Sequence, residues 1–365
     1  MPTPHQNQTA EASPPVHWAM ERALELAAAT SPHPNPRVGA VVVAPDGIAI
    51  AEDAHAGPGT PHAEAAAVGA AGSAARGATV YVTLEPCAHQ GNTPPCTEQL
   101  IAAGVGSVVV GAQDPDPRVN GRGIAMLRDA GIEVTMSDAA GAERVDPGYF
   151  HHRRTGRPRV TLKTAATIDG QVAAADGTSQ WITSPHARED GHLLRAAADA
   201  VLVGAGTLRE DDPELTVRLS GFTGRQPRPV VVAGTQALPA ERKVYRHNPL
   251  IYVPALLSDP PAGATRASTD GAAIVDLGMM LDDLGSQGVV DLLVEGGPTL
   301  AAALLAAGYV DRLVVYLGAK LAGGRGHGMF RAGFPTLSAA RDAVIADVRR
   351  LGPDLRMDIE LGAVE

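Results

Sequence analysis

The sequence predicts an α/β protein with two domains, and three observations support this. The chain has 365 residues, more than the roughly 250–300 residues at which a single core stops growing. Apolar strand candidates alternate with helix candidates, as in layered α/β domains. The alternation breaks once, at the basic stretch DPGYFHHRRTGRPRV. We therefore expect four segments: a disordered tail at 1–15, a first domain at 16–150, a linker at 151–159 and a second domain at 160–365.

In the first domain, the hydrophobic pattern predicts helices and strands in a three-layer arrangement. Residues 16–30 carry apolar side chains at helical spacing. Residues 37–53 are typical of a β-hairpin that turns at Asp46-Gly47. Six further elements follow in order: a helix at 62–71, a strand at 78–84, a short helix at 97–104, a strand at 105–113, and a helix and a strand across 121–134.

The second domain shows buried strand candidates joined by helices, which predicts a sheet rich in parallel strands. The helices are expected at 186–197 and 298–308, and surface loops at 220–229 and 258–272. The strand candidates are the apolar runs at 158–170, 198–207, 227–234, 249–255, 289–297 and 310–321.

Charge and composition exclude several classes of function. The net charge of −10 argues against a duplex nucleic acid partner, which calls for a clustered basic surface. The basic run 151–159 has no aromatic residues for base stacking and is interpreted as a solvated linker. No run approaches the roughly 18 apolar residues of a membrane span. The first 15 residues lack the basic and apolar regions of a signal peptide, so we expect a cytoplasmic protein.

Both cysteines of the chain, Cys87 and Cys96, lie in the stretch YVTLEPCAHQGNTPPC (81–96). In a reducing compartment such a pair is more often a metal site than a disulfide. Catalytic zinc takes three protein ligands and keeps an open position. His62 is the best third ligand of twelve histidines, because it begins a predicted helix and Glu64 follows two residues later. A closed structural site, with His89 as fourth ligand, is the alternative.

The resulting pattern H-x-E…P-C…C is the signature of zinc nucleobase deaminases. In that chemistry zinc activates a water molecule, and a glutamate that is not a ligand transfers protons. Glu64 fits the role of this catalytic glutamate. The match is partial, because the usual spacing is C-x-x-C and here eight residues separate the cysteines.

The longer spacing, together with blocks in both halves, resembles the family of bifunctional riboflavin-biosynthesis deaminase/reductases across about 16–361. The blocks in the first half are HPNPRVGAVVV, PHAEAAAV, YVTLEPCAHQGNTPPC and QDPDPRVNGRG. Those in the second half are LKTAATIDG, SQWITS, LLRAAADAVLVGAGTLREDDPELTVR, VEGGPTLAAALL and VVYLGAKL. The resemblance implies a cytidine-deaminase-like domain followed by a dihydrofolate-reductase-like domain, with one zinc ion per chain and NADPH.

The resemblance also implies residues that contact the deaminase substrate. Those expected to line the pyrimidine and ribose-phosphate pocket are Asn35, Ala63, His89, Asp114 and Asp116. The alternative is a purely local role, because Asn and Asp before Pro favour turns by themselves.

In the second half, VLVGAGTLRED lacks the third glycine of the dinucleotide fingerprint, since that position is Arg209, and the Rossmann interpretation fails. VEGGPTLAAALL instead places Gly296 and Gly297 between a strand and a helix that begins at Pro298, which makes an anion site. In related enzymes this turn contacts the dinucleotide phosphates.

By resemblance, two sets of residues in the second half hold ligands. The residues implied for NADPH are Ala165, Trp181, Thr207, Asp211, Gly234, Gly297, Pro298, Thr299, Leu300, Ala301, Ala302 and Ala303. Those implied for the reductase substrate are Ser179, Arg195, Leu215, Arg218 and Glu295. Where related enzymes usually carry an aspartate, this chain has Ala233-Gly234, so the contact at Gly234 would come from its backbone. The preference for NADPH over NADH comes from the resemblance alone.

The resemblance thus implies two consecutive reactions. The first deaminates 2,5-diamino-6-ribosylamino-4(3H)-pyrimidinone 5′-phosphate, and the second reduces the ribosyl side chain of the product to ribityl. We expect a homo-oligomer with small-molecule partners only. Two alternatives stay open at this point: a nucleobase deaminase with an inactive reductase-like domain, and a non-enzymatic zinc-binding protein.

Overall fold

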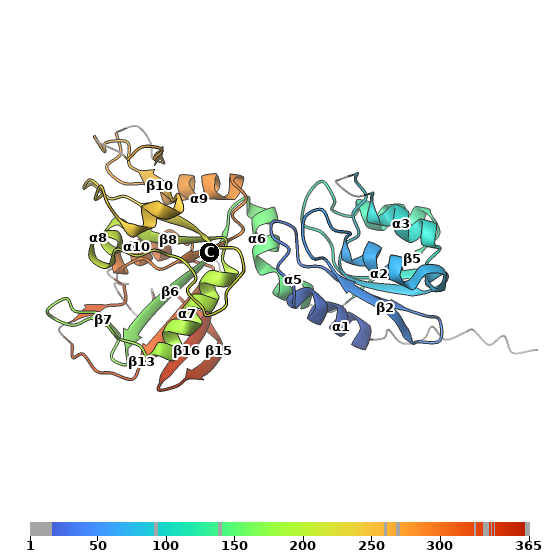
Figure 1. Ribbon diagram of the computed structural model, residues 1–365, viewed down its shortest axis with the longest axis horizontal. Coiled ribbons are helices and arrows are strands. Elements are labelled where there is room, and N and C mark those ends of the chain that lie inside the picture. The colour runs from blue at the N-terminus through green and yellow to red at the C-terminus, as the bar shows by residue number, and fades with distance from the viewer. Residues whose placement is uncertain are drawn as a thin grey trace, which may run out of the picture. The chain divides into compact units, whose positions relative to one another are not determined.

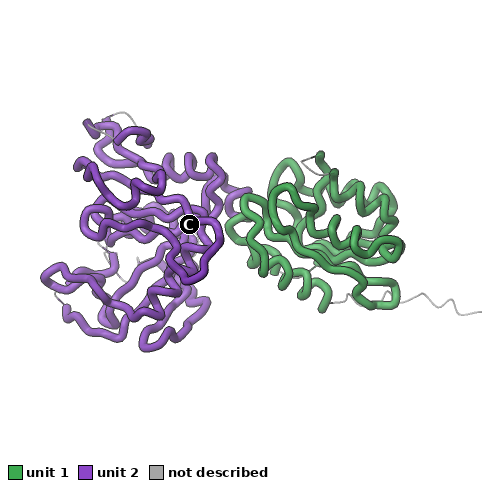
Figure 2. The backbone as a smooth tube through the Cα atoms, in the orientation of Figure 1, with its two compact units in different colours: residues 1–150 green, residues 151–365 purple. Residues whose placement is uncertain are grey.

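The computed structural model of the protein describes residues 17–90, 94–137, 141–258, 261–267, 271–324, 326–330, 336, 338 and 340–361. It consists of two compact units, residues 1–150 and 151–365 (Figure 2). The tail expected at 1–15 lies outside the described residues. The structure differs from the linker expected at 151–159, because residues 151–155 complete helix α6 (Pro147–Thr155). Buried Tyr149 and Phe150 anchor the first half of this helix to the core of the first unit.

The first unit is built on a five-stranded sheet in the order β2-β1-β3-β4-β5 (Figure 1). The predicted hairpin is present, with β1 antiparallel to both β2 and β3. The strands β3, β4 and β5 run parallel. Their bounds are β1 Gly39–Val43, β2 Ala49–Ala54, β3 Thr79–Leu84, β4 Ser107–Ala112 and β5 Glu133–Met136.

Helices cover both faces of this sheet, which confirms the predicted three layers. Because neighbouring strand residues point to opposite faces, Ala40 and Val42 pack in one cluster and Val41 and Val43 in another. The first cluster includes residues of α2 (Ala63–Ala71) and its neighbours α3 (Cys96–Ala103) and α4 (Arg122–Asp129). The second includes α1 (His17–Ala28), which also contacts α5 (Gly141–Val145). A short 3₁₀ helix, Gly72–Ala75, follows α2.

The second unit contains a nine-stranded sheet in the order β11-β10-β9-β8-β12-β6-β13-β16-β15. The strands from β11 to β13 are parallel, as predicted, and β16 and β15 continue the sheet antiparallel. The bounds are β6 Arg159–Thr167, β8 Ala200–Gly204, β9 Arg228–Val232, β10 Leu250–Val253, β11 Thr265–Arg266, β12 Asp291–Val294, β13 Arg312–Gly318, β15 Ala343–Leu351 and β16 Asp354–Leu361. A separate small ribbon pairs β7 (Gln171–Ala173) with β14 (His327–Gly328).

Two helices pack on each face of this second sheet. The cluster on one face contains side chains of α9 (Leu277–Ser286) and α10 (Pro298–Ala306). The cluster on the other face contains Leu194 of α7 (Pro185–Ala197) and Leu208 of α8 (Ala205–Asp211). A 3₁₀ helix spans Lys243–His247. The predicted strand 198–207 ends earlier than expected, because α8 begins at Ala205. None of the described helices is both long and apolar enough to cross a membrane.

Candidate metal centre and cofactor cavity

Three elements of the first unit bring His62, Cys87 and Cys96 together. His62 is the N-cap residue of α2, Cys87 follows β3, and Cys96 is the first residue of α3. Their ligating atoms lie within 4.8 Å of one another. The distances are 3.1 Å from His62 Nδ1 to Cys96 Sγ, 3.6 Å from His62 Nδ1 to Cys87 Sγ, and 3.5 Å between the sulfurs. The two cysteines are free thiols.

The donor set of this triad fits zinc. One imidazole nitrogen and two sulfurs are ligands that zinc prefers, and three protein ligands are typical of an open catalytic site. Cys87 lies in the loop that leads from β3 to α3, Cys96 begins α3, and the backbone N–H of Cys96 points to Cys87 Sγ at 3.4 Å. The triad contains no fourth His, Cys, Asp or Glu among the described residues. The geometry therefore favours an open site over a closed structural one.

Glu64 lies on the first turn of α2, two residues from His62, and its side chain is only 3% exposed. Burial raises the pKa of this carboxyl group. Its Oε2 atom has no hydrogen-bond partner among the described residues. A buried carboxylate oxygen without a partner is costly unless something binds there. Its place beside the triad fits a site that accepts water or substrate.

A chain of hydrogen bonds that the sequence did not predict lies next to His62. Asn35 Nδ2 is 2.8 Å from His55 Nε2, and His55 Nδ1 is 3.1 Å from the carbonyl oxygen of Pro61. The rings of His55 and His62 meet edge to face with centroids 5.1 Å apart. Burial lowers the pKa of His55. One feature of the sequence could have identified His55, namely a second histidine seven residues before His62 of the H-A-E motif.

The remaining residues predicted for the deaminase pocket differ in exposure. Ala63 is fully buried, and His89 is exposed near the end of the described part of the cysteine loop. Residues 91–93 of that loop lie outside the described residues. Asp114 and Asp116 are 5% and 6% exposed. Asp116 accepts from the backbone and guanidinium of Arg118, which shows that turn geometry occupies part of its side chain.

Glu85, which the sequence analysis missed, fixes the loop that carries Asp114. Its carboxylate accepts from the backbone N–H groups of four residues, Asp114, Gly121, Gly123 and Ile124, at 2.9–3.3 Å. Tyr149 also donates to both oxygens of Asp114 at 3.1 Å. Burial raises the pKa of Asp114. Because Glu85 is two residues from Cys87, one buried carboxylate ties the metal loop to the aspartate loop.

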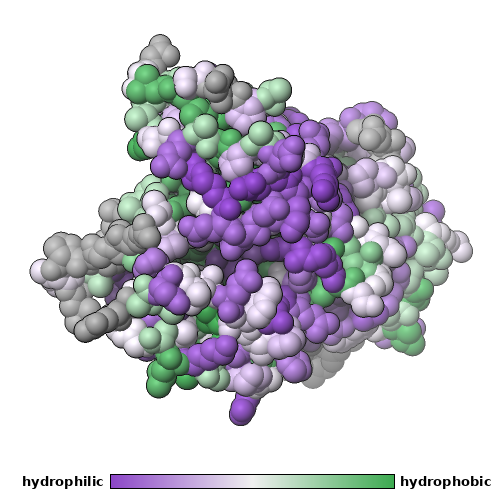
Figure 3. Space-filling view, turned by 60° about the vertical axis from the view of Figure 1, so that its left-hand side comes forward, coloured by the Kyte–Doolittle hydropathy of each residue, from purple (hydrophilic) through white to green (hydrophobic). Residues whose placement is uncertain are grey.

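The second unit contains a cavity of about 730 Å³ where β9, β8 and β12 end and β6 continues. Ligands of open α/β sheets bind at this edge, outside the carboxyl ends of the strands. Figure 3, which brings this unit forward, shows hydrophilic residues gathered across the middle of the face, where the surface is hollowed. The predicted residues that line the cavity are Ala165, Ser179, Thr207, Asp211, Gly234, Glu295, Gly297, Pro298, Thr299, Leu300 and Ala303.

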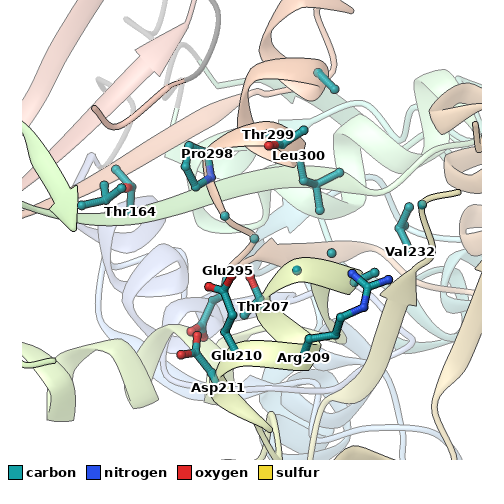
Figure 4. Close-up of a pocket in the computed structure, with 18 of the residues that line it drawn as sticks. Thr164, Thr207, Arg209, Glu210, Asp211, Val232, Glu295, Pro298, Thr299 and Leu300 are labelled. Atoms are coloured by element: carbon teal, nitrogen blue, oxygen red, sulfur yellow. The ribbon is translucent and has the colours of Figure 1, made fainter. Parts of the chain in front are cut away.

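At the centre of the cavity, the turn after β12 leads into α10. Gly297 is the N-cap residue and Pro298 occupies the first helical turn. Figure 4 shows Pro298 together with Thr299 and Leu300. A Cβ atom on Gly296 would come within 2.8 Å of Leu300 Cδ2, so any larger residue here would displace that side chain. The first N–H groups of a helix have no intrahelical partner, and the helix dipole adds positive potential. The turn therefore fits the phosphates of a dinucleotide.

Six of the predicted residues do not line the cavity. Arg195 is not among the lining residues, but its guanidinium forms a bidentate ion pair with Glu295, which lines the cavity. Leu215, Ala301 and Ala302 are buried in the core. Trp181 is 59% exposed and lies under the guanidinium of Arg188, 4.3 Å from the ring centroid. The side chain of Arg218 is 53% exposed.

Lys163, to which the sequence analysis assigned no role, lies on the wall of the cavity. Its Nζ is 4.0 Å from Glu295 Oε2 and 5.6 Å from the ring centroid of Tyr316. Tyr316 is held in turn, because its hydroxyl donates to Asp190 at 2.5 Å. The cavity therefore contains a cation and a carboxylate side by side at the β6 end.

Comparisons with known proteins agree with this geometry. Residues 158–355 match the family described as RibD C-terminal domain. Residues 15–112 match the cytidine and deoxycytidylate deaminase zinc-binding region. The riboflavin biosynthesis protein RibD of Escherichia coli K12 is 41% identical over 360 residues, which cover 93% of this chain and 97% of that protein. The RibD protein of Aquifex aeolicus is 38% identical, with 88% and 91% covered.

Solved structures show the same relationship. Acinetobacter baumannii RibD superimposes with a TM-score of 0.85 at 37% identity, covering 94% of this chain and 98% of that one. A diaminohydroxyphosphoribosylaminopyrimidine deaminase/5-amino-6-(5-phosphoribosylamino)uracil reductase from Thermotoga maritima gives a TM-score of 0.82 at 32% identity, with the same coverage. Both halves of the chain are therefore covered by relatives of high similarity.

Proposed function

The chain belongs to the RibD family of riboflavin-biosynthesis enzymes, and we propose that Glu64 and the Arg195–Glu295 pair are central to its two reactions. The protein is a bifunctional enzyme, a zinc-dependent deaminase and an NADPH-dependent reductase. It deaminates 2,5-diamino-6-ribosylamino-4(3H)-pyrimidinone 5′-phosphate and then reduces the ribosyl side chain of the product. The alternative of a nucleobase deaminase with an inactive second half is not supported, because full-length relatives match both halves.

In the first reaction, His62, Cys87 and Cys96 hold the metal and Glu64 moves protons. Zinc, when bound, activates water for attack on the ring carbon that bears the amino group. Glu64 accepts one proton of this water and passes it to the ring nitrogen, and it then transfers the second proton of the water oxygen to the departing amino group, which leaves as ammonia. Its burial and its unpartnered Oε2 support this role, because the oxygen is available to the reacting atoms.

Residues around the triad position the pyrimidine. Asn35 and His55 share a hydrogen bond beside the metal ligand His62. Ala63, the residue after His62, forms the adjacent wall of the substrate pocket. Asp114, fixed by Tyr149 and Glu85, contacts the substrate from its own loop. We assign His89 to the ribose phosphate because it is exposed on the cysteine loop. We assign Asp116, whose carboxylate accepts from Arg118, to the same substrate from the loop of Asp114.

In the second reaction, bound NADPH would supply the hydride that reduces C1′ of the opened ribose, and residues of the second unit would hold it. The turn at Gly297 and Pro298 binds the cofactor phosphates, and Thr207 and Asp211 contact it from α8. Glu295 and Ser179 face the substrate in the same cavity. Arg195 acts through Glu295, and Leu215 supports the wall from the core. The exposed guanidinium of Arg218 serves the substrate phosphate.

The observation that carries the proposal is the convergence of three zinc-type ligands beside a buried glutamate. The test is Glu64→Gln, which keeps the shape and removes the proton-transfer group. We expect zinc content to stay at one ion per chain, deamination to fall by about 10²–10⁴-fold, and reduction of the deaminated intermediate to continue. Deamination at the unaltered rate would contradict the role of Glu64.

We further propose a cytoplasmic homo-oligomer. The two free thiols suit a reducing compartment. The edge strand β15 is exposed and carries Val344, Ile345 and Val348, each more than half exposed. An exposed apolar edge strand invites pairing with another strand, so a second copy of the chain is its expected partner. Sedimentation analysis of the chain and of a Val348→Lys variant tests this assembly.

A further inference from the structure

The cavity of the second unit extends across four neighbouring strands. In the sheet the order β9-β8-β12-β6 separates β9 from β6 by three strand spacings, or about 14 Å. The turn at Gly297 and the end of β8 lie between these two strands. The cavity is therefore long enough for an extended ligand, with one end at β6 and the other at β9.

The two ends differ in chemistry. The β6 end carries Lys163 and Glu295. At the β9 end the lining residues Val232, Ala233 and Gly234 carry no charge, and the apolar residues Ile274, Val275 and Leu277 line the cavity as well. An apolar slot of this kind fits a flat adenine ring. If reduction occurs beside Glu295, as proposed above, the adenosine part of the cofactor lies at the β9 end.

Arg209 reaches into this uncharged end from the last turn of α8. In Figure 4 its guanidinium extends toward Val232 and away from the carboxylates of Glu210, Asp211 and Glu295. Within the described part of the chain, its guanidinium donates to backbone carbonyl oxygens and to no carboxylate. Its hydrogen bonds are two long ones, both from Nη2, to the carbonyl oxygens of Gln236 and Ala237 at 3.4 Å.

We propose that Arg209 binds the 2′-phosphate of the cofactor and thereby selects NADPH over NADH. Dinucleotide sites that prefer NAD place a carboxylate at the ribose 2′-hydroxyl, whereas an arginine accommodates the 2′-phosphate of NADP. Here the end of β9 offers no carboxylate, and Arg209 is the cation beside it. A guanidinium grips a phosphate through paired N–H donors and stays charged at all ordinary pH values. This inference rests on the proposed reductase function of the cavity.

The test compares two cofactors in two matched variants. Arg209→Leu removes the cation, and Arg246→Leu removes an exposed cation that lies outside the cavity lining. We expect Arg209→Leu to raise the KM for NADPH by about 10- to 100-fold, the range for hydrogen bonds to charged groups. The KM for NADH should change by less than about threefold, and Arg209→Lys should restore part of the NADPH preference. Arg246→Leu should leave both values unchanged.

The binding of cofactor fragments with and without the 2′-phosphate measures the contribution of that phosphate alone. Calorimetry should show that the unaltered chain binds adenosine 2′,5′-bisphosphate more tightly than 5′-AMP, and that Arg209→Leu removes this difference. The thermal transition of the second unit, which contains both substituted positions, reports that each variant is folded. Equal losses for NADPH and NADH, or no loss for either, would overturn the assignment of Arg209. If the unaltered chain oxidises neither nucleotide, the proposed second reaction fails as well as this inference.

Discussion

Arg195 and Glu295, 100 residues apart in the sequence, form a bidentate ion pair at the wall of the reductase cavity. Arg195 Nε lies 2.6 Å from Glu295 Oε1, and Nη2 lies 2.9 Å from Oε2. Burial by itself would raise the pKa of Glu295, but the positive charges of Arg195 and Lys163 outweigh it and lower the pKa to about 2. Glu295 is therefore ionised at every pH at which the enzyme works, and it can only accept hydrogen bonds.

Removing the positive partner should destabilise the second unit. Arg195→Met removes the only side chain that forms an ion pair shorter than 4.0 Å with Glu295 among the described residues and leaves Lys163 at 4.0 Å. Breaking a buried pair costs about 3–5 kcal/mol. We expect the thermal transition of the second unit to fall, while the exposed Arg246→Met changes it little. Reduction should be lost together with the pair. A stability within about 0.5 kcal/mol of the unaltered chain, the range of ordinary surface substitutions, would contradict the account.

The same variant should change how stability depends on pH. In the unaltered chain the folded pKa of Glu295 lies below its unfolded value, so the pair stabilises above about pH 4.5 and is lost as the pH falls toward 2. In Arg195→Met burial raises the folded pKa, so stability is highest at low pH and falls as the pH rises above the unfolded value. The difference between the two chains should therefore shrink between pH 7 and pH 4. A constant difference would show that Glu295 is not the group responsible.

Removing the metal should abolish the deaminase activity and leave the reductase activity unchanged. All three ligands lie in the first unit, so a chelator should abolish deamination and leave NADPH-dependent reduction of the deaminated intermediate intact. Added zinc should restore deamination. Cys96→Ser should reproduce the chelated state without a chelator. Loss of both activities together would contradict an independent zinc site, provided that circular dichroism shows an intact fold.

The contact between α4 and the cysteine loop is expected to be sensitive to a single methyl group. A Cβ atom on Gly123 would lie 1.9 Å from the carbonyl oxygen of Pro86, next to Cys87. Gly123→Ala should therefore force the loop to move, with about 1–3 kcal/mol of destabilisation and weaker zinc retention. Gly69→Ala on α2 is the matched control, because nothing lies within 4 Å of its Cβ position, and it should stabilise by up to about 1 kcal/mol. Equal behaviour of the two variants would contradict this packing.

Glu85 offers a test of substrate positioning. Glu85→Gln has one acceptor oxygen in place of two. Some of the four backbone N–H groups that donate to Glu85 therefore lose their acceptor, and the loop that carries Asp114 should become less rigid. We expect the KM for the pyrimidine to rise about tenfold or more, with zinc content and reduction unchanged. If this variant lost its zinc, Glu85 would instead be a residue that supports only the metal-binding loop.

Much of this architecture could be predicted from the sequence. Periodicity predicted the first hairpin, the helix that begins at His62, and the parallel strands of the second unit. The single pair of cysteines and the motif H-A-E predicted the metal triad, because zinc chemistry requires these residue types together. The family resemblance supplied eleven of the residues that line the cavity.

Other features depend on contacts that no local pattern encodes. The backbone hydrogen bonds of Glu85 come from residues 29–39 positions away, and Arg195 reaches Glu295 across the sheet. The strands β15 and β16 were missed because charged residues interrupt their apolar pattern. Residues 151–155 were expected to form a linker because they are basic, but burial of Tyr149 and Phe150 holds this segment in a helix.

The most direct test of the central claim is mass spectrometry of the diaminopyrimidine substrate after incubation with zinc-loaded protein, with and without NADPH. The account predicts replacement of one amino group by oxygen without NADPH, and a further gain of two hydrogens when NADPH is present. No change in either tube, from folded protein with zinc bound, would contradict it.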